Sequence, residues 1–131
     1  MIYVDSCLVI YAVERDDSVG DRARMALAAA LAPLAASPLV MLEAMVGPMR
    51  ERGAESQLHM WSVFDRFEML PIEPHAFVQA ARLRARNPGL QTADALHLAV
   101  AQEEGCSLLW TNDSRLAAIA PGFAVDVLRA A

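Results

Sequence analysis

The sequence predicts an α/β domain with a central, mostly parallel sheet of four to five short strands flanked by helices. Short apolar runs alternate with longer helical segments along the chain, and this alternation is typical of parallel sheets whose strands are connected by helices. The 131 residues are enough to bury a core, and the hydrophobic fraction of 56% argues against disorder. Because no repeat, linker or shift in composition divides the chain, we expect one domain over residues 1–131.

The predicted strands are the short apolar runs that end at polar or turn-forming residues. They lie at residues 1–4, 33–36, 68–72, 107–110 and 123–127. Helices are predicted between them, at residues 7–13, 22–31, 39–50, 54–67, 74–86, 90–101 and 114–120. Residues 14–21 are expected to form a polar loop. Ser37 and Thr92 are the predicted N-caps of two helices, since their hydroxyls can accept hydrogen bonds from the first backbone amides.

The predicted helix at residues 90–101 is apolar on most sides, yet Asp94 lies in its first turn. An aspartate at this position can simply complement the positive end of the helix dipole. It can also be a metal ligand held by a rigid, buried element. The choice depends on whether other carboxylates reach the same place.

Three further acids are candidates to lie close to Asp94. Asp5 and Asp113 each follow an apolar run directly, and the carboxyl ends of parallel strands lie at one edge of the sheet. Glu43 lies near the start of the helix predicted at residues 39–50. Taken singly, the aspartates could be N-caps and Glu43 a surface residue. Four carboxylates at one edge would repel one another unless a cation is present, and oxygen ligands suit Mg²⁺ or Mn²⁺.

Four short motifs carry a resemblance to a known family. They read V-D-S at residues 4–6, S-P-L-V-M-L-E at residues 37–43, T-A-D-A-L-H-L-A at residues 92–99 and T-N-D at residues 111–113. In the order and spacing of these motifs the chain resembles the PIN-domain ribonucleases, and most closely the VapC-type toxins of bacterial type II toxin–antitoxin systems. The likeness covers nearly the whole chain and implies a PIN-like fold.

The resemblance implies a Mg²⁺-dependent endoribonuclease whose catalytic and metal-binding acids are Asp5, Glu43, Asp94 and Asp113. Asp5 and Asp94 would be the principal ligands, and the other two would complete the site directly or through water. Ser6 and Asn112 would be supporting polar groups. A metal-activated water would hydrolyse the RNA phosphodiester bond, with Mn²⁺ able to replace Mg²⁺. A VapB-like antitoxin and a second copy of the chain, in a homodimer, are the implied protein partners.

The roles of several other side chains are open to more than one interpretation. His97 lies one helical turn after Asp94, and we expect it to pack in the core or to support the ligands, because hard cations seldom bind imidazole. A set of large apolar residues has the spacing of either a helical core face or a subunit interface, with core packing favoured. These residues are Met41, Met45, Met49 and Trp61.

Charge and composition limit the remaining function classes. The net charge is −5, and all eleven basic residues are arginine. RNA binding is therefore expected to rest on local positive charge, and Arg115, close after Asp113, is the predicted phosphate contact. Two cysteines indicate neither a disulfide framework nor a zinc site. With no long apolar run and no basic leader, we expect a cytoplasmic protein without a membrane segment.

Three other classes share parts of this pattern. A response-regulator receiver also carries acids at strand ends, but it needs a lysine, and this chain has none. A phosphatase of the haloacid-dehalogenase type needs a second aspartate two residues after Asp5, where this chain has Cys7. The third alternative is a catalytically inactive PIN-like domain that acts as a protein- or RNA-binding module, and the presence of all four acids argues against it.

Overall fold

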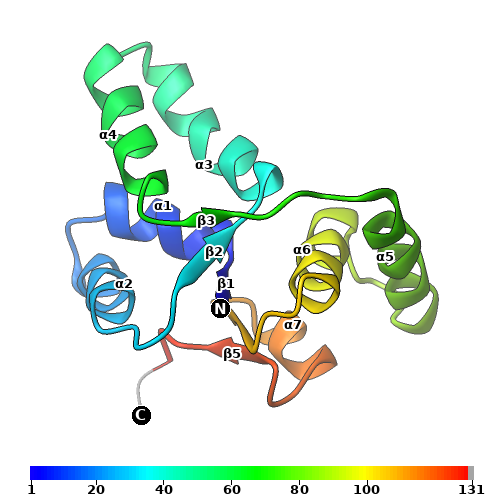
Figure 1. Cartoon of the computed structure of the whole chain (residues 1–131). Coiled ribbons are helices and arrows are strands. Elements are labelled where there is room, and N and C mark those ends of the chain that lie inside the picture. The colour runs from blue at the N-terminus through cyan, green and yellow to red at the C-terminus, as the bar shows by residue number, and fades with distance from the viewer. Residues whose placement is uncertain (130–131) are drawn as a thin grey trace.

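The computed structural model describes residues 1–129, which form seven α-helices around a five-stranded parallel sheet (Figure 1). The strands are β1 (Ile2–Val4), β2 (Leu34–Ala36), β3 (Glu68–Met69), β4 (Leu108–Thr111) and β5 (Ala124–Asp126). All neighbouring strands run parallel, in the order β3-β2-β1-β4-β5. The predicted α/β class is confirmed, and so is the sheet of four to five short strands.

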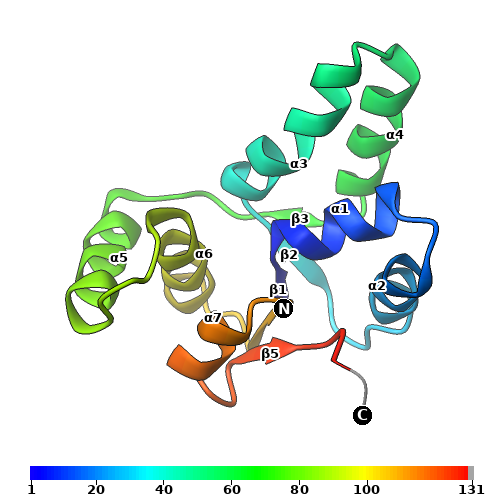
Figure 2. The same cartoon turned by 180° about the vertical axis from the view of Figure 1, so that it is seen from behind.

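The helices are α1 (Ser6–Glu14), α2 (Ser18–Ala28), α3 (Pro38–Glu51), α4 (Ala54–Phe64), α5 (Pro74–Arg86), α6 (Thr92–Glu103) and α7 (Ser114–Ile119). Figure 1 shows α1 and α2 on one side of the sheet and α5 and α6 on the other, while the α3–α4 hairpin projects from the sheet. Figure 2 shows from behind that α7 lies next to α6 and β5. None of the helices within residues 1–129 is long and apolar enough to cross a membrane.

The strand order changes direction at the centre of the sheet. β2 and β3 are added on one side of β1, whereas β4 and β5 lie on its other side. The helices that follow β1 and β4 therefore leave toward opposite sides of the sheet. In parallel sheets this arrangement opens a crevice outside the carboxyl ends of the two strands, which is the usual place for a ligand.

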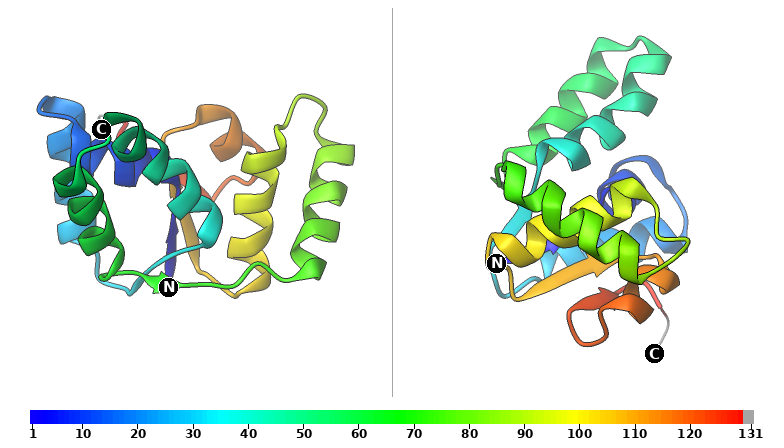
Figure 3. Two further views of the ribbon diagram at one scale, coloured as in Figure 1. Left: turned by 90° about the horizontal axis from the view of Figure 1, so that it is seen from above. Right: turned by 90° about the vertical axis from the view of Figure 1, so that its right-hand side faces the viewer.

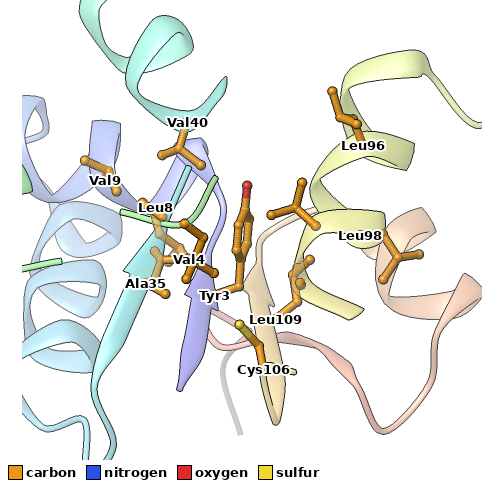
Figure 4. Packing of buried hydrophobic residues seen from close by; sticks show 14 of the residues in the cluster. Tyr3, Val4, Leu8, Val9, Ala35, Val40, Leu96, Leu98, Cys106 and Leu109 are labelled. Carbon is orange, nitrogen blue, oxygen red and sulfur yellow. The ribbon is translucent and has the colours of Figure 1, made fainter. Parts of the chain in front are cut away.

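The core packs against both faces of β1 (Figure 4). Leu8 and Val9 of α1 lie on one side, and Leu96 and Leu98 of α6 lie on the other. Full burial of side chains of this size contributes about 1.5–3 kcal/mol each. Residues 95–101 of α6 are all buried, and three of these seven are alanine, which lets the helix approach its neighbours closely. The prediction that this helix is apolar on most sides is confirmed.

Several helix boundaries differ from the prediction, and the largest differences are in α2 and α4. α2 begins at Ser18 rather than at residue 22, because the Asp17 carboxylate accepts a hydrogen bond from the Gly20 amide at 3.0 Å and caps the helix there. The polar loop before it is correspondingly shorter. α4 ends at Phe64 rather than at residue 67.

The large apolar residues of α3 and α4 do not all belong to the core. Met45 is 3% exposed, whereas Met49 is 53% exposed and Trp61 is 39% exposed. Met41 is partly buried against the core. The core interpretation is therefore correct for Met45 and wrong for Met49 and Trp61, whose side chains remain at the surface.

Candidate metal centre

Asp5 lies at the carboxyl end of β1, in the crevice where the strand order reverses. Its backbone amide donates to the carbonyl of Trp110 in β4 at 2.9 Å, which joins the ends of the two strands. One carboxylate oxygen accepts from the Ser6 amide at 2.8 Å, so that Asp5 caps α1, and the other accepts from the Thr111 hydroxyl at 2.8 Å. Asp5 is 6% exposed and is held rigidly at this edge.

Asp113 reaches the same edge from β4. Its backbone amide donates to the hydroxyl of Thr111 at 3.0 Å, so the Thr111 side chain contacts both acids. Oδ1 of Asp113 accepts from the Arg115 amide at 2.9 Å and caps α7, which leaves Oδ2 for the crevice. Asp5 and Asp113 are therefore N-caps as well as residues of the crevice, because one carboxylate has enough lone pairs for both roles.

Glu43 reaches the crevice from α3 and is oriented by His97 of α6. Nε2 of His97 and Oε1 of Glu43 lie 2.5 Å apart. Burial by itself would raise the pKa of Glu43, but the hydrogen bond and charge of His97, with a contribution from Ser6, hold the pKa below its ordinary value. Glu43 is thus an ionised acceptor, and His97 donates to it from Nε2.

His97 is itself tied to the core through Tyr3 of β1. The Tyr3 hydroxyl lies 2.7 Å from His97 Nδ1 and 2.7 Å from the Ser37 hydroxyl, and all three residues are buried. Burial raises the pKa of Tyr3, which therefore keeps its proton. Figure 4 shows the Tyr3 hydroxyl pointing away from the strands into the space between α3 and α6. A buried chain of hydrogen bonds thus runs from Ser37 to Glu43.

Asp94 lies in the first turn of α6 and faces the other three acids. Burial raises the pKa of its carboxyl, and the negative charges of Asp5, Asp113 and Glu43 raise it further, while His97 acts in the opposite direction. The α6 helix is buried over the following turns and fixes this side chain near the sheet. The four acids named from the sequence are therefore brought together by β1, α3, α6 and β4.

The four acids surround one polar pocket of about 380 Å³. Figure 3 shows, in its left panel, α1, α3, α6 and α7 arranged around the end of β1. Ser6 and Asn112 also border the pocket, as does Arg115, whose side chain is 74% exposed. All seven residues that the sequence proposed for the site thus lie at a single pocket.

The donor atoms in this pocket fit a hard divalent cation. Among the described residues, ligand atoms of Asp5, Glu43 and His97 lie within 4.8 Å of one another. His97 Nε2 is already bonded to Glu43, so carboxylate oxygens are the donors that remain. Burial, followed by the charge of Asp5, raises the pKa of Cys7 to about 12, so the nearby thiol stays protonated and is a poor ligand. A set of oxygen donors suits Mg²⁺, Mn²⁺ or Ca²⁺.

The two N-caps predicted from serine and threonine have different outcomes. Ser37 is the N-cap of α3, as predicted, but its side chain makes no capping hydrogen bond, because its hydroxyl is bonded to Tyr3 instead. The prediction of Thr92 as an N-cap is wrong. Thr92 is the first residue of α6, and Gln91 is the N-cap. The Thr92 hydroxyl accepts from Arg84 Nη1 at 2.9 Å, which ties α6 to α5.

Two residues that shape the site were not found from the sequence. Thr111 orients Asp5, and Tyr3 orients His97. Thr111 is part of the T-N-D motif and ends an apolar strand, so its position at the crevice could have been predicted from the sequence. Tyr3 gave none, because a tyrosine in a buried strand is ordinary and its partners lie 34 and 94 residues away in the chain. His97 supports a candidate ligand, which agrees with one of its two expected roles.

The family model of the PIN domain matches residues 2–121, and the chain belongs to the PIN-domain family. Within this family, the chain is 32% identical over 123 residues to Ribonuclease VapC23 of Mycobacterium tuberculosis, a match that covers 89% of this chain and 96% of that protein. The family resemblance noted in the four sequence motifs is confirmed.

Solved structures show the same fold. A toxin–antitoxin complex from Klebsiella pneumoniae contains a chain with a TM-score of 0.81 and 23% identity, over 97% of this chain and 98% of that chain. VapC20 of Mycobacterium tuberculosis, described as a sarcin–ricin loop cleaving toxin, has a TM-score of 0.78 and 17% identity, over 92% of this chain and 95% of that chain. At these identities the likeness concerns the fold alone.

Proposed function

We propose that this chain is a metal-dependent endoribonuclease of the VapC kind that hydrolyses RNA phosphodiester bonds. The observation that carries the proposal is the position of Asp94, whose carboxyl faces Asp5, Asp113 and Glu43 at one pocket. Four carboxylates this close together repel one another and cost folding free energy unless a cation offsets their charge. Carboxyl groups perturbed in this way are typical of functional sites, which supports a bound cation here. The relative VapC23 is named a ribonuclease, which supports the same reaction here.

The cation proposed for the pocket is Mg²⁺, with Mn²⁺ as its replacement, because only oxygen donors are free to bind it. When bound, it would lower the pKa of water and offset the charge that develops on the phosphate. Asp5 and Asp94 are its proposed principal ligands. Glu43 and Asp113 complete the ligand set directly or through water.

The remaining residues of the pocket bind and orient the RNA strand. Ser6 and Asn112 supply neutral polar groups beside the acids. Arg115 lies at the rim, and its guanidinium can contact a phosphate since its side chain is 74% exposed and its ion pair with Asp113 is long, at 3.9 Å. His97 keeps Glu43 ionised and fixed in direction. No serine, cysteine or lysine nucleophile is required for this hydrolysis.

Asp94→Asn tests the reaction directly. The variant should lose RNA cleavage by at least about a hundredfold, because it removes one charged ligand of the cation. Asn has nearly the size of Asp and suits the first turn of a helix, so circular dichroism should show an intact fold. The assay uses purified protein with Mg²⁺ or Mn²⁺, and the RNA ends are mapped by sequencing.

Asp16→Asn is the matched control for this test, because Asp16 is an exposed aspartate in the loop before α2. It should cleave RNA as the wild type does. Undiminished cleavage by Asp94→Asn would contradict the site. If the wild type itself cleaves no RNA with either metal, the alternative of a PIN-like binding module takes the place of the nuclease.

We propose two protein partners as well. The first is an antitoxin, because a chain of the toxin–antitoxin complex from Klebsiella pneumoniae shares this fold along nearly its whole length. The second is another copy of this chain, because apolar side chains on α3 and α4, including Met49 and Trp61, remain exposed.

A further inference from the structure

A second pocket adjoins the acidic one. It has a volume of about 390 Å³, within the range of small-ligand sites, and lies between the α5–α6 turn, the start of α6 and α7. Figures 1 and 2 both show α7 beside α6 at this place. Asp94, Asp113 and Arg115 border both pockets, so the two are neighbours that share part of their lining.

The chemistry of the second pocket differs from that of the first. Leu90 and Leu116 are buried and supply an apolar floor, to which Ile119 adds. Arg86 is exposed at the rim on the α5 side, and Arg115 is exposed on the α7 side. An apolar floor with two arginines at its rim suits an aromatic ring that is attached to negative charge.

We propose that this second pocket binds one base of the RNA, next to the phosphate that lies at the acidic pocket. The inference rests on the proposed function, and it adds the place where sequence preference would arise. Arg115 borders both pockets and can contact the phosphate that links the bound base to the reacting bond. Because the net charge is −5, positive side chains at this rim are also where an RNA strand can be attracted.

A pocket-filling variant tests the proposal. Ala118 is exposed on α7 and borders the second pocket but not the acidic one, so Ala118→Trp would occupy the space for the base. The matched control is Ala81→Trp, because Ala81 is an exposed alanine of α5 that borders neither pocket. Both are made in an Asp5→Asn background, in which we expect the RNA to stay intact, and EDTA is added to remove divalent metal. Asp5 does not border the second pocket.

Binding is measured by fluorescence anisotropy with a short single-stranded RNA and with copies that carry one abasic site, moved along the strand. We expect Ala118→Trp to weaken binding about tenfold, the scale of one stacked base, and Ala81→Trp to leave it unchanged. One abasic position should weaken binding to the Asp5→Asn protein by a similar factor. The same abasic site should have no further effect on the Ala118→Trp protein, since the pocket is already filled.

Equal affinities for Ala118→Trp and Ala81→Trp would overturn the proposal and favour a protein side chain as the occupant. Additive effects of the abasic site and the tryptophan would overturn it too. Since the assay needs no cleavage, its result is independent of the nuclease test. The nuclease proposal fails only if the wild type cannot cleave RNA with Mg²⁺ or Mn²⁺.

Discussion

At the scale of single residues, Asp94 combines a cost to folding with a proposed use in metal binding. Its carboxyl is partly buried and faces three other acids, so its pKa is raised in the folded protein. The folded state therefore binds this proton more tightly than the unfolded state does. Stability contributed by protonated Asp94 is present below its ordinary pKa of 3.8 and is lost as the pH rises through the raised value.

In the absence of divalent metal, Asp94→Asn should therefore make the protein more stable at pH 7. The wild type in EDTA should lose stability as the pH rises above about 4, and the variant should lose less over the same range. Added Mg²⁺ should raise the melting temperature of the wild type more than that of the variant, because the cation binds only the folded state. Thermal unfolding followed by circular dichroism checks both effects.

Asp16→Asn again serves as the control, since this exposed aspartate faces no acidic cluster and its removal should change neither trend. A wild type that is as stable as Asp94→Asn in EDTA at pH 7 would show that the four acids do not repel one another. In that case the main argument for a cation in the pocket would be lost.

At the scale of elements, two glycines lie close to α1 and to its connection with α2, and their surroundings differ. A Cβ on Gly20 of α2 would come within 2.0 Å of the backbone oxygen of Arg15, in the connection between α1 and α2. A Cβ on Gly47 of α3 would come within 2.9 Å of Oε1 of Glu14, the end of a flexible side chain on α1. Backbone cannot move aside without shifting a helix, whereas a carboxylate can rotate away.

Gly20→Ala should therefore lower the free energy of unfolding by about 2 kcal/mol or more, as expected for overpacking. Gly47→Ala should change it by less than about 1 kcal/mol, because the displaced Glu14 carboxylate is offset by the better helix propensity of alanine. Urea unfolding of both variants measures the difference. Equal destabilisation by the two substitutions would mean that α1 and α2 are less closely packed than these contacts imply.

The positions of the site residues within their helices and strands explain which features could be predicted from the sequence and which could not. Asp5 directly follows β1 and Asp113 lies two residues after β4, so their meeting at one edge was predictable from local pattern. Glu43 and Asp94 lie in early turns of predicted helices, which made them candidates but left a surface or capping role open until the family resemblance was considered. Ser37 is the N-cap of α3, as its local pattern predicts, but its hydroxyl makes a tertiary hydrogen bond to Tyr3 and does not bond to the first amides of the helix. Contacts of this kind depend on which elements pack together, and local sequence carries little information about that.

At the scale of the whole molecule, exposed apolar side chains gather on α3, α4 and α5. Figure 1 shows the α3–α4 hairpin projecting from the sheet and α5 on the outer side of α6. The exposed residues there are Leu42, Val46, Met49, Leu58, Trp61, Phe77 and Val78. On α3 they recur every three or four residues and form one stripe, which is the pattern of a helix that packs against a partner.

Met49→Glu should therefore weaken the proposed homodimer at least about tenfold, because a carboxylate would lose its hydration in an apolar interface. Met25→Glu is the control, since Met25 on α2 is 69% exposed and stands apart from this stripe. Light scattering after size exclusion, over a range of concentrations, gives the masses of both variants and the wild type. A dimer that persists unchanged in Met49→Glu would place its interface elsewhere. A monomeric wild type would contradict the homodimer, and the stripe would then be the proposed contact surface for the antitoxin.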